Sequence, residues 1–542
     1  MLHHDLRTRA VTLRAVRFRG LSFASGCPAA VAIALLVATI AACGGREETP
    51  LGSPTSRPPE NATADVAATA GPTAAACLPI PQPYLAPSPD AVVEGTVGSE
   101  LVIDAADLLG LGATLSYEWR QVRAGDESLE YLTRRPVSMS GSANRAVTVV
   151  ARWPGVYGLE VTAHERSGDV TVRRVDVRVP PSPGWDLELR GAIFGDVFGR
   201  LGAAEFDLNP DSPECRDRVL HAAMDGPARA GLDAVVFVPA SFYSTVRPQA
   251  AFTVWRDLSL EDDQFYAALV RAAHDAGLIT VQIEQDAPPP DFTPAQHAEL
   301  EAAKQDGAWR VAWFAAYREW MAARAARADA YGIDVFVPYL LVDFTFLPDV
   351  YPDYERRWSE ILQDIRRVFS GRIGMSFSVL AEPVSFSDDF DVVLLSLDGG
   401  QYTFSPLMAD ATDPTHEEIR AITHELLDVN LRGADPSKPI WVIFQVGSVD
   451  GQGGVEDPDI RETQAIDFQE QALYYEAILE SLREDPRVAG VLTERWDWFD
   501  QFDRGGGSLE ARFFDQTRES SPRSKPAEQV LGLWFGDPSP GE

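Results

Sequence analysis

Eight apolar segments of strand length, spread through the second two thirds of the chain, constrain its fold more than any other feature. Each is apolar almost throughout rather than at alternate positions, so a sheet built from them must be covered on both faces. Such burial is typical of parallel strands in α/β proteins. The predicted strands span 187–194, 234–239, 279–283, 335–342, 373–379, 392–397, 440–446 and 488–492.

Helical patterns lie between most of these strands. They span 216–230, 262–276, 309–330, 354–369, 416–431 and 465–483. Eight strands alternating with helices over about 350 residues predict an α/β fold of the closed (β/α)₈ or TIM-barrel type, covering 185–537. The connection between the fifth and sixth strands has little helical pattern, so that repeat is expected to be abbreviated. An open doubly wound sheet is the alternative, but no glycine-rich nucleotide loop follows a strand.

A different pattern precedes the barrel, between residues 89 and 180. Short runs alternate between apolar and polar residues, with turn residues between them, which predicts a small all-β sandwich of antiparallel strands. The runs are 100–104, 114–121, 146–151, 157–163 and 170–179. The segments 117–120 and 153–157 make this domain similar to a PKD or related immunoglobulin-like module, with Trp119 in its core. A proline-rich segment, 180–184, links it to the barrel.

Residues 1–42 have the composition of an export signal. Five arginines and one acidic residue, Asp5, occupy the first 19 positions, and an apolar run over 29–42 is short for a bilayer span. The sequence before Cys43 resembles the bacterial lipobox, which implies that Cys43 is lipidated. An uncleaved anchor is the alternative. Both interpretations predict an extracytoplasmic protein anchored to the bacterial cell membrane. The Pro/Ala/Thr-rich segment 43–88 predicts a disordered stalk.

The net charge, the cysteines and the spacing of possible metal ligands limit which binding partners, disulfides and metal sites are expected. The net charge of −34 argues against nucleic acid and anionic lipid surfaces, because both would be repelled. Cys77 and Cys215 are a possible disulfide pair in an oxidising compartment. No spacing of His, Cys and Asp resembles a zinc or calcium motif, so neither a metal nor a cofactor is expected.

The active site of such a barrel lies at the carboxyl ends of its strands. Acidic, amide and aromatic residues are concentrated there. The predicted substrate-binding residues are Asp196, Tyr243, Glu284, Asp286, Tyr339, Asp398, Tyr402, Gln445, Trp496, Asp497 and Trp498. Aromatic rings stack on sugar rings, and carboxylates and amides bind hydroxyl groups, so the partner predicted is a polysaccharide or oligosaccharide. The alternative for each aromatic residue is packing in the core.

Several segments, in order, resemble glycoside hydrolase family 113 over roughly residues 186–500. They include 259–278 with its Ala-His-Asp-Ala-Gly-Leu ending, 312–320, 332–336, 358–371 and the Lys-Pro-Ile at 438–440. The resemblance implies a (β/α)₈ retaining glycosidase acting on β-mannan-type chains. It also implies a catalytic Glu at the end of the fourth strand and another at the end of the seventh.

This chain departs from the family at both positions. The fourth-strand Glu falls near Leu341 and the seventh-strand Glu falls on Gln445, which cannot act as a carboxylate nucleophile. A retaining mechanism needs two carboxyl groups about 5–5.5 Å apart. Asp343 and Glu494 are the candidate catalytic pair, relocated from the family positions. Alternatively, these acids only bind hydroxyl groups or cap helices.

Three hypotheses for the function remain open. The first is a surface-tethered glycoside hydrolase with relocated carboxylates. The second is a catalytically inactive protein that keeps the cleft for glycan binding. The third is a structural or adhesion lipoprotein without a saccharide site.

Overall fold

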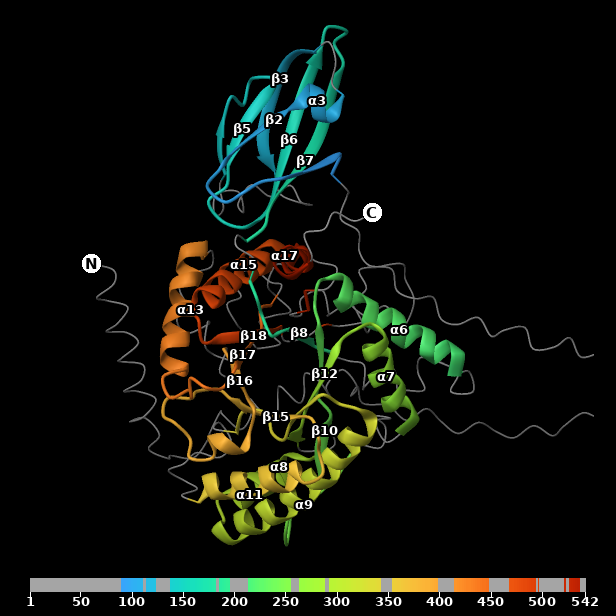
Figure 1. Cartoon of the computed structure of the whole chain (residues 1–542), viewed down its shortest axis with the longest axis vertical. Coiled ribbons are helices and arrows are strands. Elements are labelled where there is room, and N and C mark those ends of the chain that lie inside the picture. Colours follow the sequence, from blue (N-terminus) through green and yellow to red (C-terminus); the bar gives the residue numbers. More distant parts are fainter. Residues whose placement is uncertain are drawn as a thin grey trace, which may run out of the picture.

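The computed structural model describes most of the residues from 89 onward. They are 89–110, 114–122, 137–181, 185–194, 213–254, 263–287, 292–342, 353–397, 414–447, 467–493, 496, 521–522 and 526–536. They form two small β-sheets followed by a barrel that is surrounded by helices (Figure 1). Among the described helices, none combines the length and the apolar character needed to cross a bilayer.

The eight predicted strands close into a barrel, as expected. Every neighbouring pair is parallel, and the last strand pairs with the first, Leu189 lying opposite Gly490. The strands in chain order are β8 (Leu189–Ile193), β9 (Ala234–Phe237), β12 (Ile279–Ile283), β14 (Val335–Val337), β15 (Arg372–Phe377), β16 (Val392–Ser396), β17 (Ile440–Phe444) and β18 (Val488–Thr493). The closed barrel is therefore confirmed, and the open sheet is wrong.

Helices surround this barrel. They are α6 (Pro213–Arg229), α7 (Asp263–Asp275), α8 (Pro294–Lys304), α9 (Gly307–Tyr331), α11 (Tyr354–Arg366), α13 (His416–Asn430), α15 (Phe468–Glu484) and α17 (Pro526–Phe535). Between β15 and β16 the chain makes only a 3₁₀ turn, η4 (Ser387–Asp389), so the expected abbreviated repeat is confirmed. The sequence pattern did not predict α8 or α17.

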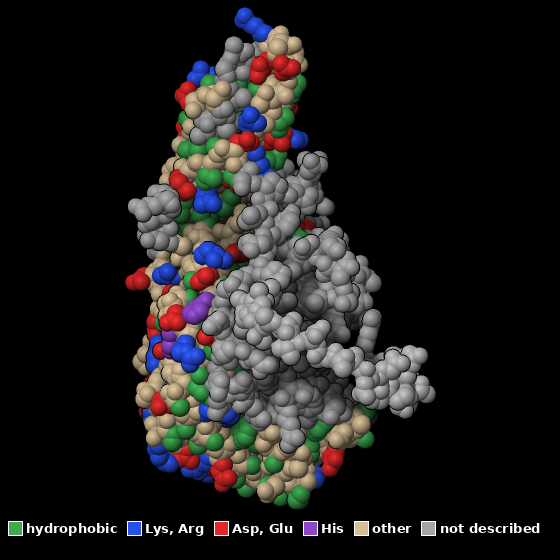
Figure 2. Space-filling view, turned by 90° about the vertical axis from the view of Figure 1, so that its right-hand side faces the viewer, with side chains coloured by type: hydrophobic (Ala, Val, Ile, Leu, Met, Phe, Trp, Pro, Cys, Tyr) green, Lys and Arg blue, Asp and Glu red, His purple; other side chains and the backbone are tan. Residues whose placement is uncertain are grey.

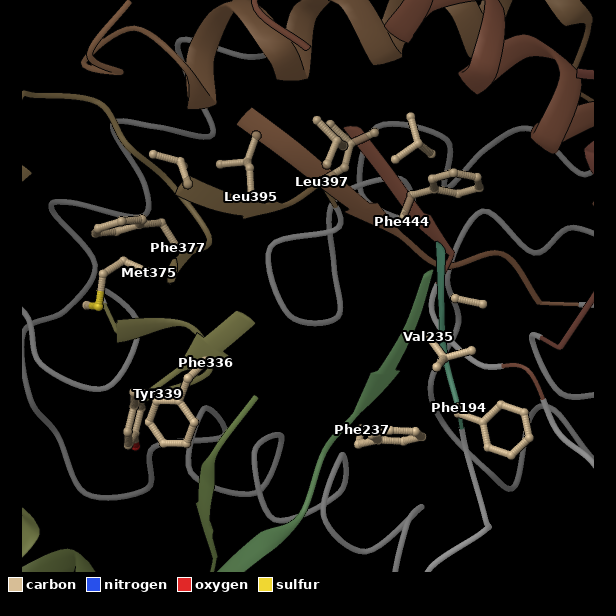
Figure 3. Packing of buried hydrophobic residues seen from close by; sticks show 14 of the residues in the cluster. Phe194, Val235, Phe237, Phe336, Tyr339, Met375, Phe377, Leu395, Leu397 and Phe444 are labelled. Carbon is tan, nitrogen blue, oxygen red and sulfur yellow. The ribbon is translucent and has the colours of Figure 1, made fainter. Parts of the chain in front are cut away.

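Side chains on each barrel strand alternate between two apolar layers, because successive residues of a strand point to opposite faces. One cluster consists of strand residues and fills the lumen. It comprises Leu189, Ala234, Val236, Val281, Ile283, Val335, Val337, Val392, Leu394, Trp441, Ile443 and Leu492. The intervening residues pack against the helices. Figure 3 shows several of them, including Val235, Phe237, Phe336, Met375, Leu395 and Phe444. This double burial explains why the strand segments are continuously apolar.

The lumen accommodates one large ring, that of Trp441, beside a glycine. A Cβ atom built on Gly490 of the neighbouring strand would lie 2.4 Å from Cδ1 of Trp441. Real Cβ atoms do not approach other atoms so closely, so the indole occupies the space that a side chain at position 490 would fill. The glycine is thus required by packing.

Residues 89–181 form the two small sheets. One has the strand order β1 (Ala91–Glu94), β7 (Val170–Val179), β6 (Gly155–Glu165) and β3 (Thr114–Val122), and the other has β2 (Glu100–Asp104), β5 (Ala146–Val150) and β4 (Ser138–Ser140). Trp119 is buried between them, and its indole N–H donates to the carbonyl of Asn144 at 3.1 Å. The predicted core position of Trp119 is confirmed. The edge strand β1 runs parallel to β7, which the antiparallel prediction did not include.

These sheets lie beside the outer helices of the barrel, next to α15 and α17 (Figure 1). Strand β6 contacts α17, and the Trp153 ring lies 4.9 Å from the ring of His416, the first residue of α13. On the face drawn in Figure 2, basic and acidic side chains are intermixed over the described surface. That face shows no continuous basic patch among the described residues.

Candidate functional site

The chain continues past β12 as a second short strand that the sequence did not predict. Strand β13 (Gln285–Ala287) pairs with β10 (Ala240–Thr245), which pairs with β11 (Ala251–Val254), so a small sheet extends one side of the barrel at its carboxyl end. The pairing of the third and fourth barrel strands also continues here. The N–H of Glu284 donates to the carbonyl of Val337 at 2.8 Å, and the N–H of Leu340 donates to the carbonyl of Glu284 at 3.0 Å. The side-chain alternation of β12 is therefore kept through residues 284–286.

Glu284 points away from the lumen, toward α9. Its side chain has no exposed surface. The Arg324 Nε donates to one carboxylate oxygen at 3.0 Å, and the Ser241 hydroxyl donates to the other at 3.1 Å. The amide of Gln282 also donates to this carboxylate. Glu284, predicted to bind substrate, is enclosed in a buried ion pair between strand and helix.

Asp286 also points outward, and two other predicted residues surround it. The hydroxyl groups of Tyr243 and Tyr339 both donate to its carboxylate. The indole N–H of Trp313 in α9 donates to the Tyr243 oxygen at 2.9 Å. Burial, followed by the negative charge of Asp286, raises the pKa of Tyr243 well above 10, so this phenol remains a protonated donor. The structure brings these three residues together, but behind the strands rather than in the lumen.

Uncharged polar side chains occupy the lumen face at the same end of the barrel. Gln285 lies between the two outward-facing acids, so its side chain points inward. Ser376 and Ser396 alternate with outward residues of β15 and β16 and are buried. Gln445 follows the outward-facing Phe444, whose ring packs against Tyr475 at 5.0 Å, so Gln445 faces the lumen and is partly exposed. Because β12 and β17 are four strands apart in an eight-stranded barrel, Gln285 and Gln445 extend from opposite walls.

The end of the fourth strand has an unusual backbone. Leu341 has φ of 55°, a left-handed conformation that disfavours a branched side chain. Its N–H donates to the Ser376 hydroxyl of the neighbouring strand at 3.2 Å. The side chain is 8% exposed. An apolar residue therefore occupies this strand end, held in place from the adjacent strand.

Trp496, another predicted substrate contact, is completely buried in this structure. Its backbone N–H donates to the carbonyl of Ile193 at 2.6 Å, and its indole lies against Gly226 of α6, where a Cβ atom would be 3.4 Å from Nε1. The ring thus closes the space between the first helix and the end of the first strand. Contact of this ring with a sugar stays a prediction.

The remaining predicted residues lie outside the described part of the chain. They are Asp196, Asp343, Asp398, Tyr402, Glu494, Asp497, Trp498, Cys43 and Cys77, together with the side chain of Cys215. The catalytic pair, the lipidation site and the disulfide therefore stay predictions. Within the described residues, no group of three or more His, Cys, Asp or Glu side chains is arranged to hold a metal ion.

Gln285, Ser376 and Ser396 also face the barrel lumen and were not predicted from the sequence. The signal that could have found them is the strand alternation itself. Val281 and Ile283 are lumen residues, so the next position of the same parity is Gln285, not Glu284 or Asp286. Charge and aromatic character alone do not show which face of a strand a residue occupies.

Comparison with known proteins places this barrel among glycoside hydrolases. The model of glycoside hydrolase family 113 matches residues 233–511. The solved GH113 β-mannanase AaManA from Alicyclobacillus acidocaldarius, in complex with ManMIm, is 19% identical, with a TM-score of 0.41, over 65% of this chain and 98% of its own. A second solved complex of a GH113 β-1,4-mannanase is 17% identical, with a TM-score of 0.43, over 65% of this chain and 99% of its own. No curated protein matches this chain.

Proposed function

The chain belongs to glycoside hydrolase family 113, and we propose that it binds a polysaccharide at the carboxyl ends of its barrel strands without hydrolysing it. Chains of the β-mannan type are the first candidates, because the resemblance to the family implies them. The lumen end presents amide and hydroxyl groups, which match the hydroxyl groups of a sugar. A binding protein on a hydrolase scaffold accounts for both features.

The observation that carries this proposal is the identity of two residues. Leu341 and Gln445 stand at the strand ends where the family resemblance places the catalytic Glu pair. Gln445 faces the lumen, and its neutral amide can bind a hydroxyl group but cannot form a glycosyl ester. Leu341 can neither donate nor accept a proton. Retaining hydrolysis needs a carboxyl group at both positions.

The nearby acids do not replace that pair. Glu284 is bound by Arg324 and Ser241, and Asp286 is bound by two tyrosine hydroxyls. Both carboxylates face the helix layer. Among the lumen-facing residues that the structure describes at this end of the barrel, none is a carboxylate.

A hydrolase with displaced carboxylates is the second candidate. The observation that favours it is that Leu492 faces the lumen and Glu494 follows it by two residues, while Asp343 follows Leu341 by two. Strand alternation would give Glu494 the face of Leu492, whereas Asp343 follows the left-handed Leu341, where this alternation is interrupted, and is near it in sequence. Such a pair could perform general acid and base catalysis.

One experiment separates the two candidates. The soluble chain beginning at residue 44 is incubated with β-mannan, β-glucan and β-xylan, and both reducing-sugar release and binding are measured. We expect binding to one glycan without release, and no change in release for Asp343→Asn or Glu494→Gln. Release that disappears in either variant would replace the binding proposal with the displaced-carboxylate hydrolase.

A double variant tests whether the missing pair is the reason for inactivity. Leu341→Glu combined with Gln445→Glu supplies carboxyl groups at both family positions. We expect weak but measurable release from the glycan that the wild-type chain binds. Absence of binding by the wild-type chain to every glycan of the panel would contradict the proposal and favour a structural role.

We also propose that the protein is displayed outside the cytoplasm through a lipid on Cys43. The support is the sequence before Cys43 and the basic and apolar segments that precede it. The segment 43–88 would serve as a stalk, and the sheets of residues 89–181 as a spacer of the PKD or immunoglobulin-like kind. Incorporation of labelled palmitate in a bacterial host should be lost in Cys43→Ala, and labelling that persists in this variant would refute the assignment.

A further inference from the structure

We infer that Gln285 is a ligand-contacting residue of this site, binding hydroxyl groups of an uncharged sugar from the wall opposite Gln445. The inference rests on the proposed glycan-binding function and adds to it a residue and a charge class of ligand. It depends on where Gln285 points, what its amide contacts and which residues share its end of the lumen.

The direction of the Gln285 side chain follows from its neighbours. Glu284 and Asp286 are both fixed outward, the first by Arg324 and the second by Tyr243 and Tyr339. A residue between two outward-facing residues of an extended segment must point inward. Gln285 is therefore aimed into the carboxyl end of the lumen, above the apolar cluster that contains Ile283.

The amide of Gln285 is not used in any hydrogen bond within the described part of the protein. The residue is 5% exposed, and no hydrogen bond joins its side chain to another group in the described part of the chain. The polar side chains next to it in sequence are fully engaged, as Gln282 shows by accepting from Tyr266 at 2.6 Å and donating to Glu284. The amide atoms of Gln285 are not among the fully enclosed polar atoms that lack a partner, so they keep contact with solvent at the open end of the lumen, where a ligand can reach them.

The composition of the lumen end defines the ligand class. The described polar side chains that face it are amides and hydroxyls, namely those of Gln285, Gln445, Ser376 and Ser396. An amide both donates and accepts, as a sugar hydroxyl does. None of these groups carries a charge that would balance a carboxylated sugar, and the net charge of −34 repels anionic chains. The ligand is therefore an uncharged sugar chain.

The test compares the same substitution on the two faces of one strand. Gln285→Leu removes the lumen amide while keeping its approximate volume. Gln282→Leu is the matched control, because its amide faces the helix layer. Binding of β-1,4-linked hexasaccharides of mannose, glucose and xylose, and of a hexagalacturonate, is measured by titration calorimetry on the soluble chain from residue 44. Thermal unfolding is followed for each variant.

We expect Gln285→Leu to weaken binding of the neutral hexasaccharide about tenfold, with an unfolding midpoint close to that of the wild type, because no internal hydrogen bond is lost. Gln282→Leu should bind normally but unfold at a lower temperature, because it loses two internal hydrogen bonds. A residue that was merely structural would not separate affinity from stability in this way.

Three other results would overturn the inference. Normal affinity in Gln285→Leu, with a wild-type chain that binds, would refute the role of Gln285 and leave the proposed function intact. Preference of the wild-type chain for hexagalacturonate would refute the uncharged class. If the wild-type chain bound none of these sugars, the proposed function itself would fail, and this inference with it.

Discussion

At the residue scale, the ion pair between Glu284 and Arg324 combines a fully buried carboxylate with a guanidinium group that is almost buried. Glu284 is fully buried, and the Arg324 side chain is 10% exposed. Removing two charges from water costs free energy that their attraction only balances when the geometry is good and the remaining polar atoms are bonded. Ser241 and Gln282 provide those additional bonds to the carboxylate. The pair connects β12 to α9 at the end of the barrel where the site lies.

Removing one partner of this ion pair should be strongly destabilising. We expect Arg324→Met to lower the free energy of unfolding by about 3–5 kcal/mol, because Glu284 remains buried without a cation. Urea denaturation measures the change. Combining it with Glu284→Gln should recover most of the loss, and a single variant within about 1 kcal/mol of wild type would show that water reaches the carboxylate.

At the element scale, the barrel depends on strands that approach closely and on helices that are joined at their surfaces. Gly490 allows β18 to pass the Trp441 ring of β17. On the outside, Arg318 of α9 contacts both Glu360 and Asp364 of α11. The contact at Gly490 is a packing requirement in the interior, whereas the contacts of Arg318 are partly exposed ion pairs. The stability of the first should therefore depend on side-chain volume, and that of the second on pH.

We expect Gly490→Ala to destabilise the protein by about 1–3 kcal/mol or more, because the added methyl group overlaps the Trp441 ring. Gly532 of α17 is the control, since a Cβ there meets no atom within 4 Å. Gly532→Ala should stabilise by about 0.5–1 kcal/mol through its better helix propensity. Urea unfolding of both variants tests this pair, and equal effects of the two substitutions would contradict it.

The contact between α9 and α11 should depend on pH. The hydrogen bond from Arg318 holds the pKa of Asp364 below its ordinary value of 3.8. A lowered pKa in the folded state means that the stabilisation is complete above about pH 4 and is lost as the pH falls through the lowered pKa. Asp364→Asn should therefore cost about 0.2–1 kcal/mol at pH 7 and almost nothing near pH 2. Urea unfolding at both pH values measures the difference, and a cost that is independent of pH would argue against this ion pair.

At the scale of the whole molecule, the two β-sheets contact the barrel at its helices α13 and α17. Trp153 covers His416 at the start of α13, where the imidazole Nε2 lies 3.3 Å from Glu480 of α15. The hydroxyl of Tyr157 donates to the carbonyl of Trp153 at 2.6 Å and so fixes this loop. The contact therefore joins the loop before β6 to two adjacent barrel helices.

Trp153→Ala should loosen this junction without unfolding either part. We expect faster proteolytic cleavage between the sheets and the barrel, and a loss of about 0.5–1.5 kcal/mol from the lost ring contact. Limited proteolysis followed by mass spectrometry locates the cleavage. The exposed neighbour Arg152→Ala should behave as wild type, and cleavage of Trp153→Ala at the wild-type rate would show that other contacts hold the junction.

The sequence by itself determined a parallel sheet covered on both faces, because eight continuously apolar segments can be buried only in such a sheet, and the number of strands favoured a closed barrel over an open sheet. It also determined the core position of Trp119 and the resemblance to family 113, which the family match confirms. These features follow from local periodicity and from the order of motifs along the chain.

Only the tertiary structure decided which of the two alternating sets of strand residues faces the lumen, and what encloses the other set. Glu284 and Asp286 looked equivalent to lumen residues in the sequence, yet their partners come from α9, β10 and the fourth strand. Arg324 is 40 residues from Glu284, and Tyr339 is 53 residues from Asp286. Likewise, the sheet formed by β10, β11 and β13 depends on pairing between distant segments. A carboxylate is enclosed or left open by what packs against it, and that packing exists only once the chain has closed into the barrel.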